Sequence, residues 1–228
     1  TIKSKKVGVL TGILYMAPYT LSGKNVCPNA SAGCAAACLN TAGRGAMKSV
    51  KRARLKKTNR FWDDRGQFLH DLAEEVGKLQ RRAEAIGMLA AVRLNGTSDL
   101  PYERYKVPGT DKNIMELFPA VQFYDYTKLE NRFIGKKLPA NYHLTFSRAE
   151  DNDHKLAAVL EYTSASVVFS GKLPATWRGY PVIDGDEHDA RFTDAGPGTI
   201  IGLTAKGKAR HDGSGFVVPS HGTDSTWN

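Results

Sequence analysis

Three cysteines lie close together near the start of the chain, and the sequence contains no others. Cys27, Cys34 and Cys38 fall within the twelve residues CPNASAGCAAAC, with the spacing C-x6-C-x3-C. Thiolates bind metals, and three thiols gathered in one short segment suggest a shared function. Most of the intervening residues are small, so the backbone can wrap closely around a compact group.

The spacing also predicts how the three side chains are presented. Cys34 and Cys38 stand four residues apart, which places them on one face if this segment forms a helical turn. Cys27 would reach in from the preceding loop, which Pro28 stiffens.

Three cysteines are one short of a closed tetrahedral zinc site, and they suit a [4Fe-4S] cluster better. Three irons would each take one cysteine, leaving the fourth for a substrate, a cofactor or a non-cysteine ligand. Two alternatives remain open. One is zinc with a His or Asp as fourth ligand, and the other is no metal at all, with inert or partly disulfide-bonded cysteines.

A strongly basic segment follows the cysteines. Residues 44–60 contain eight Lys or Arg and no acid, and their helix-forming composition predicts a basic helix. Such a helix either contacts a polyanion or is simply solvated. The net charge of +9 permits binding to nucleic acid. The candidate contact residues are Lys48, Lys51, Arg52, Lys56 and Lys57.

The length and composition suggest one ordinary globular domain. The chain has 228 residues, 41% of them hydrophobic, and we expect a single domain over residues 1–210. Within it, residues 25–45 would bind the metal cluster, and residues 211–228 would form a surface tail. Glycines and a proline interrupt the apolar run at residues 7–21, so we expect neither a membrane span nor a signal peptide.

Strand-like and helix-like segments alternate along most of the chain. This order predicts parallel strands joined by right-handed crossovers. We expect an α/β protein with an incomplete, partly open TIM-like β/α barrel and a cysteine-rich loop near the N-terminus. The expected strands are residues 6–12, 88–94, 121–124, 142–146, 166–169, 181–183 and 199–203, and the expected helices are residues 68–86, 113–118, 128–134 and 153–162.

Polar residues follow several of these strands. In parallel sheets and barrels the carboxyl ends of the strands meet at one edge, where ligands bind. Lys128 and Arg148 would suit an anionic group on a small molecule. The candidate cavity residues are Asn95, Ser98, Asp99, Asp125, Lys128, Ser147, Arg148 and Lys172.

The segments CPNASAGCAAAC, RLNGTSDL, QFYDYTK, YHLTFSRAED, VIDGDEHDARF and IIGLTAKG resemble the bacteriophage gene product 88 domain family, whose function is uncharacterised. The resemblance implies a phage protein made in the cytoplasm of the bacterial host. It supplies no reaction, so the catalytic residues stay unknown.

The chain is more distantly similar to the radical S-adenosylmethionine enzymes, which join a three-cysteine [4Fe-4S] cluster to a full or partial barrel. This similarity implies S-adenosylmethionine as a cofactor. However, those enzymes usually have the spacing C-x3-C-x2-C, and Gly96 is the nearest counterpart here of their glycine-rich segment.

Two functions follow. The first is an iron–sulfur protein that acts as a redox or radical-type enzyme. The alternative is a nucleic-acid-binding phage protein with a structural iron–sulfur or zinc site. The sequence does not indicate the oligomeric state.

Overall fold

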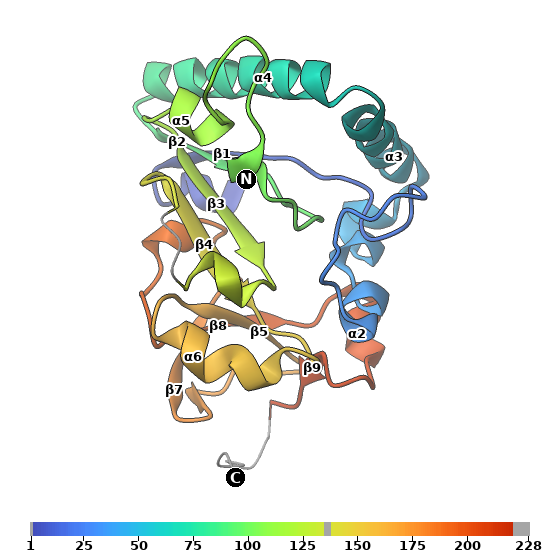
Figure 1. Ribbon diagram of the computed structural model, residues 1–228. Coiled ribbons are helices and arrows are strands. Elements are labelled where there is room, and N and C mark those ends of the chain that lie inside the picture. Colours follow the sequence, from blue (N-terminus) through green and yellow to red (C-terminus); the bar gives the residue numbers. More distant parts are fainter. Residues whose placement is uncertain (1, 135–137, 221–228) are drawn as a thin grey trace.

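A computed structural model describes residues 2–134 and 138–220, and it shows a mixed α/β protein built on one open sheet (Figure 1). In the part of the chain described, the strand order is β1-β2-β3-β4-β5-β8-β7-β6, and β9 pairs with β5. The sheet therefore ends at β1 on one side and β6 on the other. The strands are β1 (Val9–Ile13), β2 (Leu89–Arg93), β3 (Gln122–Thr127), β4 (Tyr142–Ser147), β5 (Ala165–Phe169), β6 (Thr176–Trp177), β7 (Tyr180–Asp184), β8 (Ile200–Thr204) and β9 (Val217–Val218).

Most of the sheet is parallel, so the carboxyl ends of its strands lie along one edge. All pairs from β1 to β8 in this order are parallel, as is the pairing of β7 with β8. The exception is the β6–β7 hairpin. Its two turn residues, Arg178 and Gly179, both have positive φ, as a type I′ turn requires.

The helices are short except for two. They are α1 (Ile2–Lys5), α2 (Ala32–Ala36), α3 (Lys48–Asp63), α4 (Arg65–Ala85), α5 (Ile114–Leu117) and α6 (Leu156–Leu160). Single 3-10 turns are η1 (Leu39–Thr41), η2 (Gly43–Ala46), η3 (Tyr102–Arg104), η4 (Glu130–Arg132), η5 (Asp153–Lys155), η6 (Arg191–Thr193) and η7 (Gly207–His211). No helix among the described residues is both long and apolar enough to cross a lipid bilayer.

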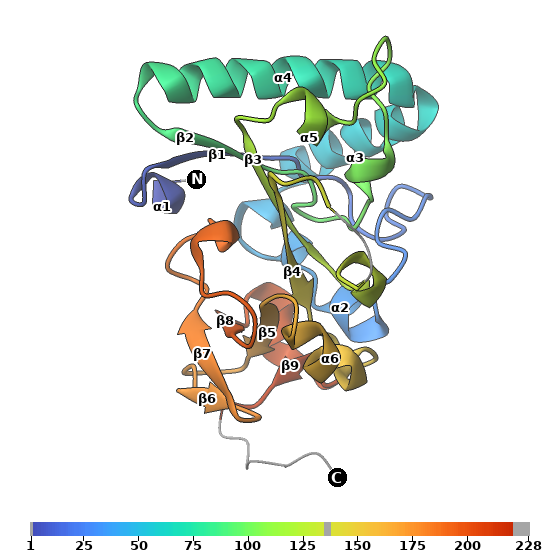
Figure 2. The ribbon, with the colours of Figure 1, turned by 60° about the vertical axis from the view of Figure 1, so that its left-hand side comes forward.

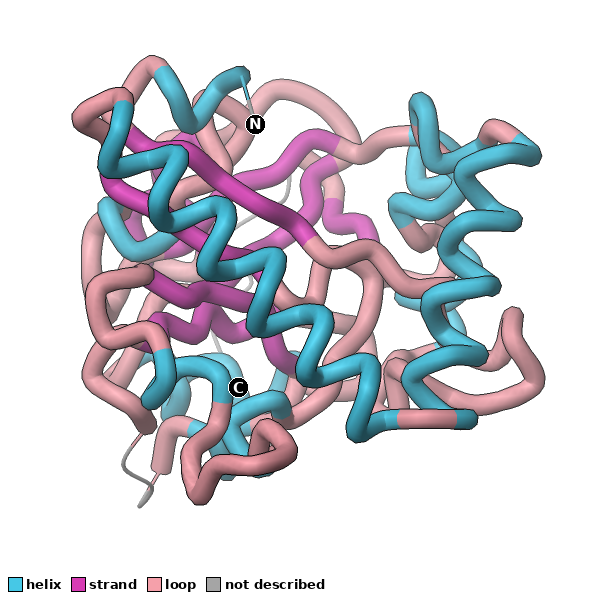
Figure 3. Tube along the Cα trace, turned by 90° about the horizontal axis from the view of Figure 1, so that it is seen from above, coloured by secondary structure: helices cyan, strands magenta, loops and turns pink. Residues whose placement is uncertain are grey.

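One face of the sheet is apolar, and the long helix α4 lies over it (Figure 3). Because side chains alternate along a strand, Val92, Phe123 and Leu144 all point to this face. They pack with Leu69 and Val76 of α4 in the largest core cluster. Farther along the sheet, α6 covers the same face in a second cluster.

The other face is covered by the loop between β7 and β8 rather than by a long helix (Figure 2). Ala190 and Phe192 of this loop pack against Val9 and Tyr124. At the carboxyl end, residues of β2 and β8 line one common cavity, although three strands lie between them. The sheet must therefore curve around this second face.

The expected α/β class and the open, mostly parallel sheet are confirmed, and each expected strand is present to within a few residues. Four local expectations were wrong. The segment at 128–134 forms only the turn η4, because Leu129 has an extended backbone and regular helix does not continue beyond Arg132. The basic helix begins at Lys48, since residues 43–46 form η2. Helix α1 was not expected, and residues 217–218 of the expected tail pair with β5 as β9.

Phe123 offers a test of the core between the sheet and α4. Its side chain is fully buried in the largest cluster. Phe123→Ala should lower the free energy of unfolding by about 3–5 kcal/mol, because it removes buried apolar area and leaves a cavity. Ile86→Ala, at a site about half exposed, is the control and should cost under about 0.5 kcal/mol in the same denaturant titration. Equal losses in the two variants would contradict this account of the core.

Candidate functional site

The three cysteines line a common cavity at the carboxyl ends of β2, β3 and β4. This cavity, here called the cysteine cavity, has a volume of about 120 Å³. Two more cavities border the same segment. The outer cavity, of about 440 Å³, lies toward α3 and is also lined by all three cysteines. The inner cavity, of about 250 Å³, lies under the second face of the sheet and is lined by Cys34 and Cys38.

Local hydrogen bonds shape the backbone around the cysteines. The N–H of Cys27 donates to Asn25 Oδ1 at 2.8 Å, and its carbonyl accepts from Ala30 at 3.0 Å. Ser31 caps α2, because its hydroxyl oxygen accepts from the N–H of Cys34 at 3.0 Å. In Figure 1 this segment, coloured blue, lies on the side toward which the β3 arrow points.

Glu150 ties α2 to the end of β4, and the sequence analysis did not anticipate it. Its carboxylate accepts from the Ser31 hydroxyl at 2.8 Å and from the N–H of Gly33 at 2.7 Å. A Cβ atom at residue 33 would lie 2.0 Å from Ser214 Oγ and 2.7 Å from this carboxylate, so any larger residue would displace both side chains. The requirement for glycine was not recognisable from the sequence, because the contact joins residues 117 positions apart.

The expected placement of Cys34 and Cys38 on one helical turn was wrong. Helix α2 ends at Ala36, and Cys38 has an extended backbone with φ −52° and ψ 137°. The chain turns there into η1. The two side chains still line the same cavities, which they reach from different backbone segments.

The environment of the thiols disfavours their charged form. Burial, the largest effect, and the neighbouring thiols of Cys38 and Cys34 together raise the pKa of Cys27 to about 12, although a 3.5 Å contact from the N–H of Tyr19 opposes this rise. Burial also raises the pKa of Cys38, while the N–H of Asn40 and the cations Arg54 and Lys128 oppose this rise. All three cysteines are free thiols.

The residues present fit a single metal ion poorly. Within residues 2–134 and 138–220, no three His, Cys, Asp or Glu side chains converge closely enough to hold one ion. The three thiols therefore share a cavity without forming the tight tetrahedral group of a zinc site.

A short loop after β2, residues 95–99, forms one wall of the cysteine cavity, and Asp125 holds it in place through hydrogen bonds to Asn95. The Asp125 carboxylate accepts from the N–H of Asn95 at 2.6 Å, from Asn95 Nδ2 at 3.1 Å and from the Tyr142 hydroxyl at 3.0 Å. Asp125 lies inside β3 and is fully buried. It lines none of the three cavities, so its expected place in the cavity was wrong. The strand runs three residues farther than predicted, to Thr127 instead of residue 124.

Asp99 joins this wall to two other segments. Its N–H donates to the carbonyl of Val26, just before Cys27, at 2.9 Å. Its carboxylate accepts from the N–H of Lys128 at 3.0 Å and pairs with Arg132 at 3.4 Å. Arg132 is buried and also pairs with Glu103 at 2.7 Å. Asn95, Ser98 and Asp99 thus line the cysteine cavity as expected, while Asn95 and Asp99 also hold its shape.

The expected cations divide into three groups. Lys128 lines the cysteine and inner cavities and donates to Ser147 Oγ at 2.8 Å. Arg148 lines the inner cavity, but its guanidinium pairs with Asp153 at 2.7 Å and donates to the carbonyl of Phe216 at 3.1 Å. These contacts occupy the guanidinium, so Arg148 stabilises the fold instead of offering a free cation to a ligand. Lys172 is exposed and lines none of the three cavities.

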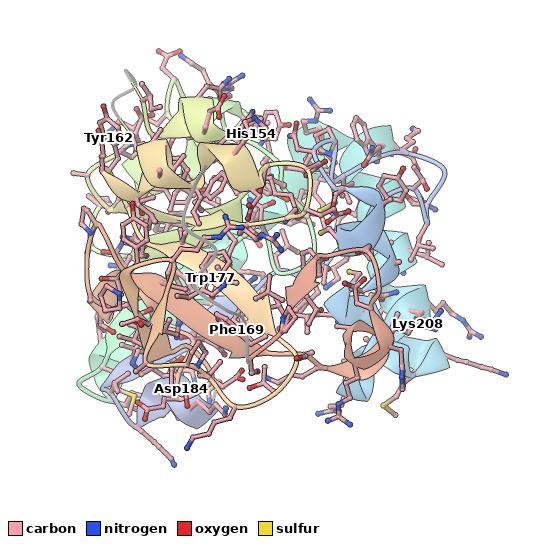
Figure 4. The ribbon with its side chains drawn as sticks, turned by 90° about the horizontal axis from the view of Figure 1, so that it is seen from below. His154, Tyr162, Phe169, Trp177, Asp184 and Lys208 are labelled. Atoms are coloured by element: carbon pink, nitrogen blue, oxygen red, sulfur yellow. The ribbon has the colours of Figure 1, made fainter. Side chains whose placement is uncertain are left out.

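Four cations at the site were missed, among them Lys206, which lines the inner cavity and pairs with Asp186. Arg93 ends β2 and lines both the cysteine and inner cavities, with its guanidinium 4.5 Å from the ring centre of Tyr126. Arg54 and Lys208 line the outer cavity. Lys208, labelled in Figure 4, belongs to η7, and its N–H donates to Thr41 Oγ1 at 3.3 Å. The one available signal was Arg93 itself, a charged residue inside an otherwise apolar strand.

The family model for gene product 88 matches residues 1–220 of the sequence. The chain belongs to the gene product 88 family. This is a phage-type family of uncharacterised function. Searches of curated proteins and of solved structures gave no match. The similarity to radical S-adenosylmethionine enzymes therefore stays an analogy.

The basic helix of this gene product 88 family member presents most of its cations to solvent. Lys48, Lys51, Arg52 and Lys56 are exposed, and no ion pair of theirs is found among the described residues. Lys57 points instead into a groove against α4, and burial lowers its pKa. Its expected place on the basic surface was therefore wrong.

Asp125 predicts a pH dependence of stability. Burial raises its pKa to about 7, against about 3.9 in an unfolded chain. Between about pH 4 and 7 the folded state thus binds more protons, so stability should fall by about 4 kcal/mol as pH rises through this window, since each pKa unit corresponds to about 1.4 kcal/mol. Asp125→Asn should remove that loss, measured by denaturant unfolding at several pH values. Asp63→Asn, at an exposed carboxylate, should keep it. An unchanged pH profile in Asp125→Asn would contradict the assignment.

Proposed function

We propose that this gene product 88 family member is an iron–sulfur protein whose [4Fe-4S] cluster is bound by Cys27, Cys34 and Cys38. The observation that supports this most is the convergence of all three thiols on one cavity at the carboxyl edge of a parallel sheet. A polynuclear cluster suits this arrangement better than zinc does. Each cysteine binds a different iron atom, so the thiolates need not converge on one point.

The charges around the cavity also support a thiolate-bound cluster. Three thiolates and the cluster together carry negative charge, which is costly to bury without compensation. Arg54 and Lys128 act on Cys38, and Lys51 and Lys208 line the outer cavity with the cysteines. These cations would offset the charge of the bound cluster.

The fourth iron would face polar side chains of the cysteine cavity. Asn95, Ser98 and Ser147 lie on its wall, beside the opening to the inner cavity. When bound, the cluster would supply one-electron transfer or Lewis-acid chemistry to a ligand there. A partial barrel of the TIM type, and S-adenosylmethionine as cofactor, belong to this proposal by analogy alone. The host cytoplasm, which keeps thiols reduced, is the proposed location.

A second candidate function is nucleic-acid binding through α3. Four exposed cations of this helix lack acidic partners among the residues described. They are Lys48, Lys51, Arg52 and Lys56. Phosphates would supply the missing negative charge. A cluster or zinc ion at the cysteines would then stabilise the segment that leads into the helix.

Metal analysis tests the first function. Anaerobically purified protein should contain about four irons and four sulfides per chain. Cys27→Ala, Cys34→Ala and Cys38→Ala should each lose this content, because each removes the ligand of one iron. Met47→Ala is the matched control, since Met47 is 51% exposed shortly after the cysteines and lines none of the three cavities. Full iron content in any cysteine variant would refute the ligand assignment, and zinc in the wild type would favour a structural site.

Salt-dependent binding tests the second function. Replacement of Lys48, Lys51, Arg52 and Lys56 by Gln should weaken binding to duplex DNA. The slope of log affinity against log salt concentration should fall by about 3–4, because each phosphate contact contributes about 0.9. Lys57→Gln is the control on the same helix and should change neither quantity, as measured by fluorescence anisotropy. A quadruple variant that binds like the wild type would eliminate α3 as the interface.

A further inference from the structure

The inner cavity has walls of opposite charge. Arg93 of β2 and Lys128, just after β3, lie on one side with Ser147 of β4. Asp186 and Asp189, from the loop between β7 and β8, line the same cavity. Lys206 also lines the cavity and pairs with Asp186, so the acid at this end that makes no ion pair among the described residues is Asp189. An uneven distribution of charge around one cavity favours a ligand that is anionic at a single end.

Arg93 is partly buried and lacks a carboxylate partner among the described residues, as does the buried Arg54, whose guanidinium donates instead to Asn40 Oδ1 at 3.0 Å. Arg132, Arg148 and Arg191 pair with Glu103, Asp153 and Asp194 at 2.7, 2.7 and 3.1 Å. Arg93 makes no ion pair in the described part of the chain, and its Nε atom is buried without a hydrogen-bond partner. A partly buried cation normally has such a partner, because an unsatisfied buried donor is costly.

Tyr126 fixes the position of this guanidinium. The ring centre lies 4.5 Å from Arg93 Cζ, which is a close cation–π contact. Stacking occupies one face of the planar group and leaves the donors on its edge for a ligand. Such an edge matches the paired oxygens of a carboxylate or phosphate. Lys128 supplies a second cation lining the same cavity, with Ser147 as its present partner.

We infer that the inner cavity binds a small molecule through a carboxylate or phosphate group held by Arg93, with Lys128 as a secondary contact. This inference goes beyond the iron–sulfur proposal, because the anion contacts involve no cysteine. The two sites are nevertheless adjacent, since Cys34 and Cys38 line the inner cavity. A ligand held by Arg93 would thus lie beside the cysteine segment.

Calorimetric titration tests the inference with two probes, inorganic phosphate and propionate, each at an ionic strength held constant with sodium chloride. The wild type should bind at least one of them saturably, and the tighter of the two identifies the anionic group. Arg93→Gln should weaken this binding by about tenfold or more, because it removes a charged bidentate donor. Arg93→Lys keeps the charge but loses the planar fork, so it should bind with intermediate affinity.

Arg81→Gln is the matched control, because Arg81 is exposed on α4, and it should bind both probes like the wild type. Arg93→Gln should unfold at a denaturant concentration equal to or above that of the wild type when no anion is added, since an unpaired cation has been removed. No saturable binding of either probe, or equal binding in Arg93→Gln, would overturn the inference. The titration is repeated on Cys27→Ala: anion binding there without iron separates this site from the cluster proposal.

Discussion

The hydrogen bonds accepted by the buried carboxylate of Asp125 determine where the wall of the cysteine cavity lies. They hold Asn95 at the end of β2, and the loop that follows then contacts the cysteine segment. Thr97 Oγ1 donates to the carbonyl of Met16 at 2.6 Å, and the N–H of Asp99 donates to the carbonyl of Val26 at 2.9 Å. Because Val26 precedes Cys27, these hydrogen bonds and the loop 95–99 link the interior of β3 to the first cysteine.

The cations around the thiols compensate charge only when the cysteines are deprotonated. Burial favours neutral thiols, as the raised pKa values of Cys27 and Cys38 show. Neutral thiols need no compensating charge, yet Arg54 and Lys128 are close enough to act on Cys38. Their placement is useful when the sulfurs are deprotonated, and metal binding is the ordinary cause of deprotonation at neutral pH. The placement of these cations therefore favours the proposed metal-binding role over inert cysteines.

Much of the fold followed from the sequence, whereas the finer geometry of the site did not. Periodicity identified α4 and the parallel strands, because a buried helix face and buried strands depend on local patterns of apolar residues. The short segments were harder: one turn at Glu130–Arg132 replaced an expected helix, since such segments depend on tertiary contacts such as the Arg132–Glu103 ion pair. The sequence identified Lys128 as a cavity residue but not Arg93, whose function depends on a cavity formed by strands distant in sequence. The sequence also could not show that the Arg148 guanidinium already pairs with Asp153.

Lys128 connects the two proposed sites. Its side chain lines both the cysteine cavity and the inner cavity, and its charge acts on the thiol of Cys38. Its present partner, the hydroxyl of Ser147, is neutral, so an anion in the inner cavity would attract it more strongly. An anion there would offset part of the positive charge that stabilises the thiolate of Cys38. The bound anion and the cluster would then influence each other's affinity equally, as thermodynamic linkage requires. Because Arg54 acts on Cys38 from the other side, this coupling would weaken the cluster without releasing it.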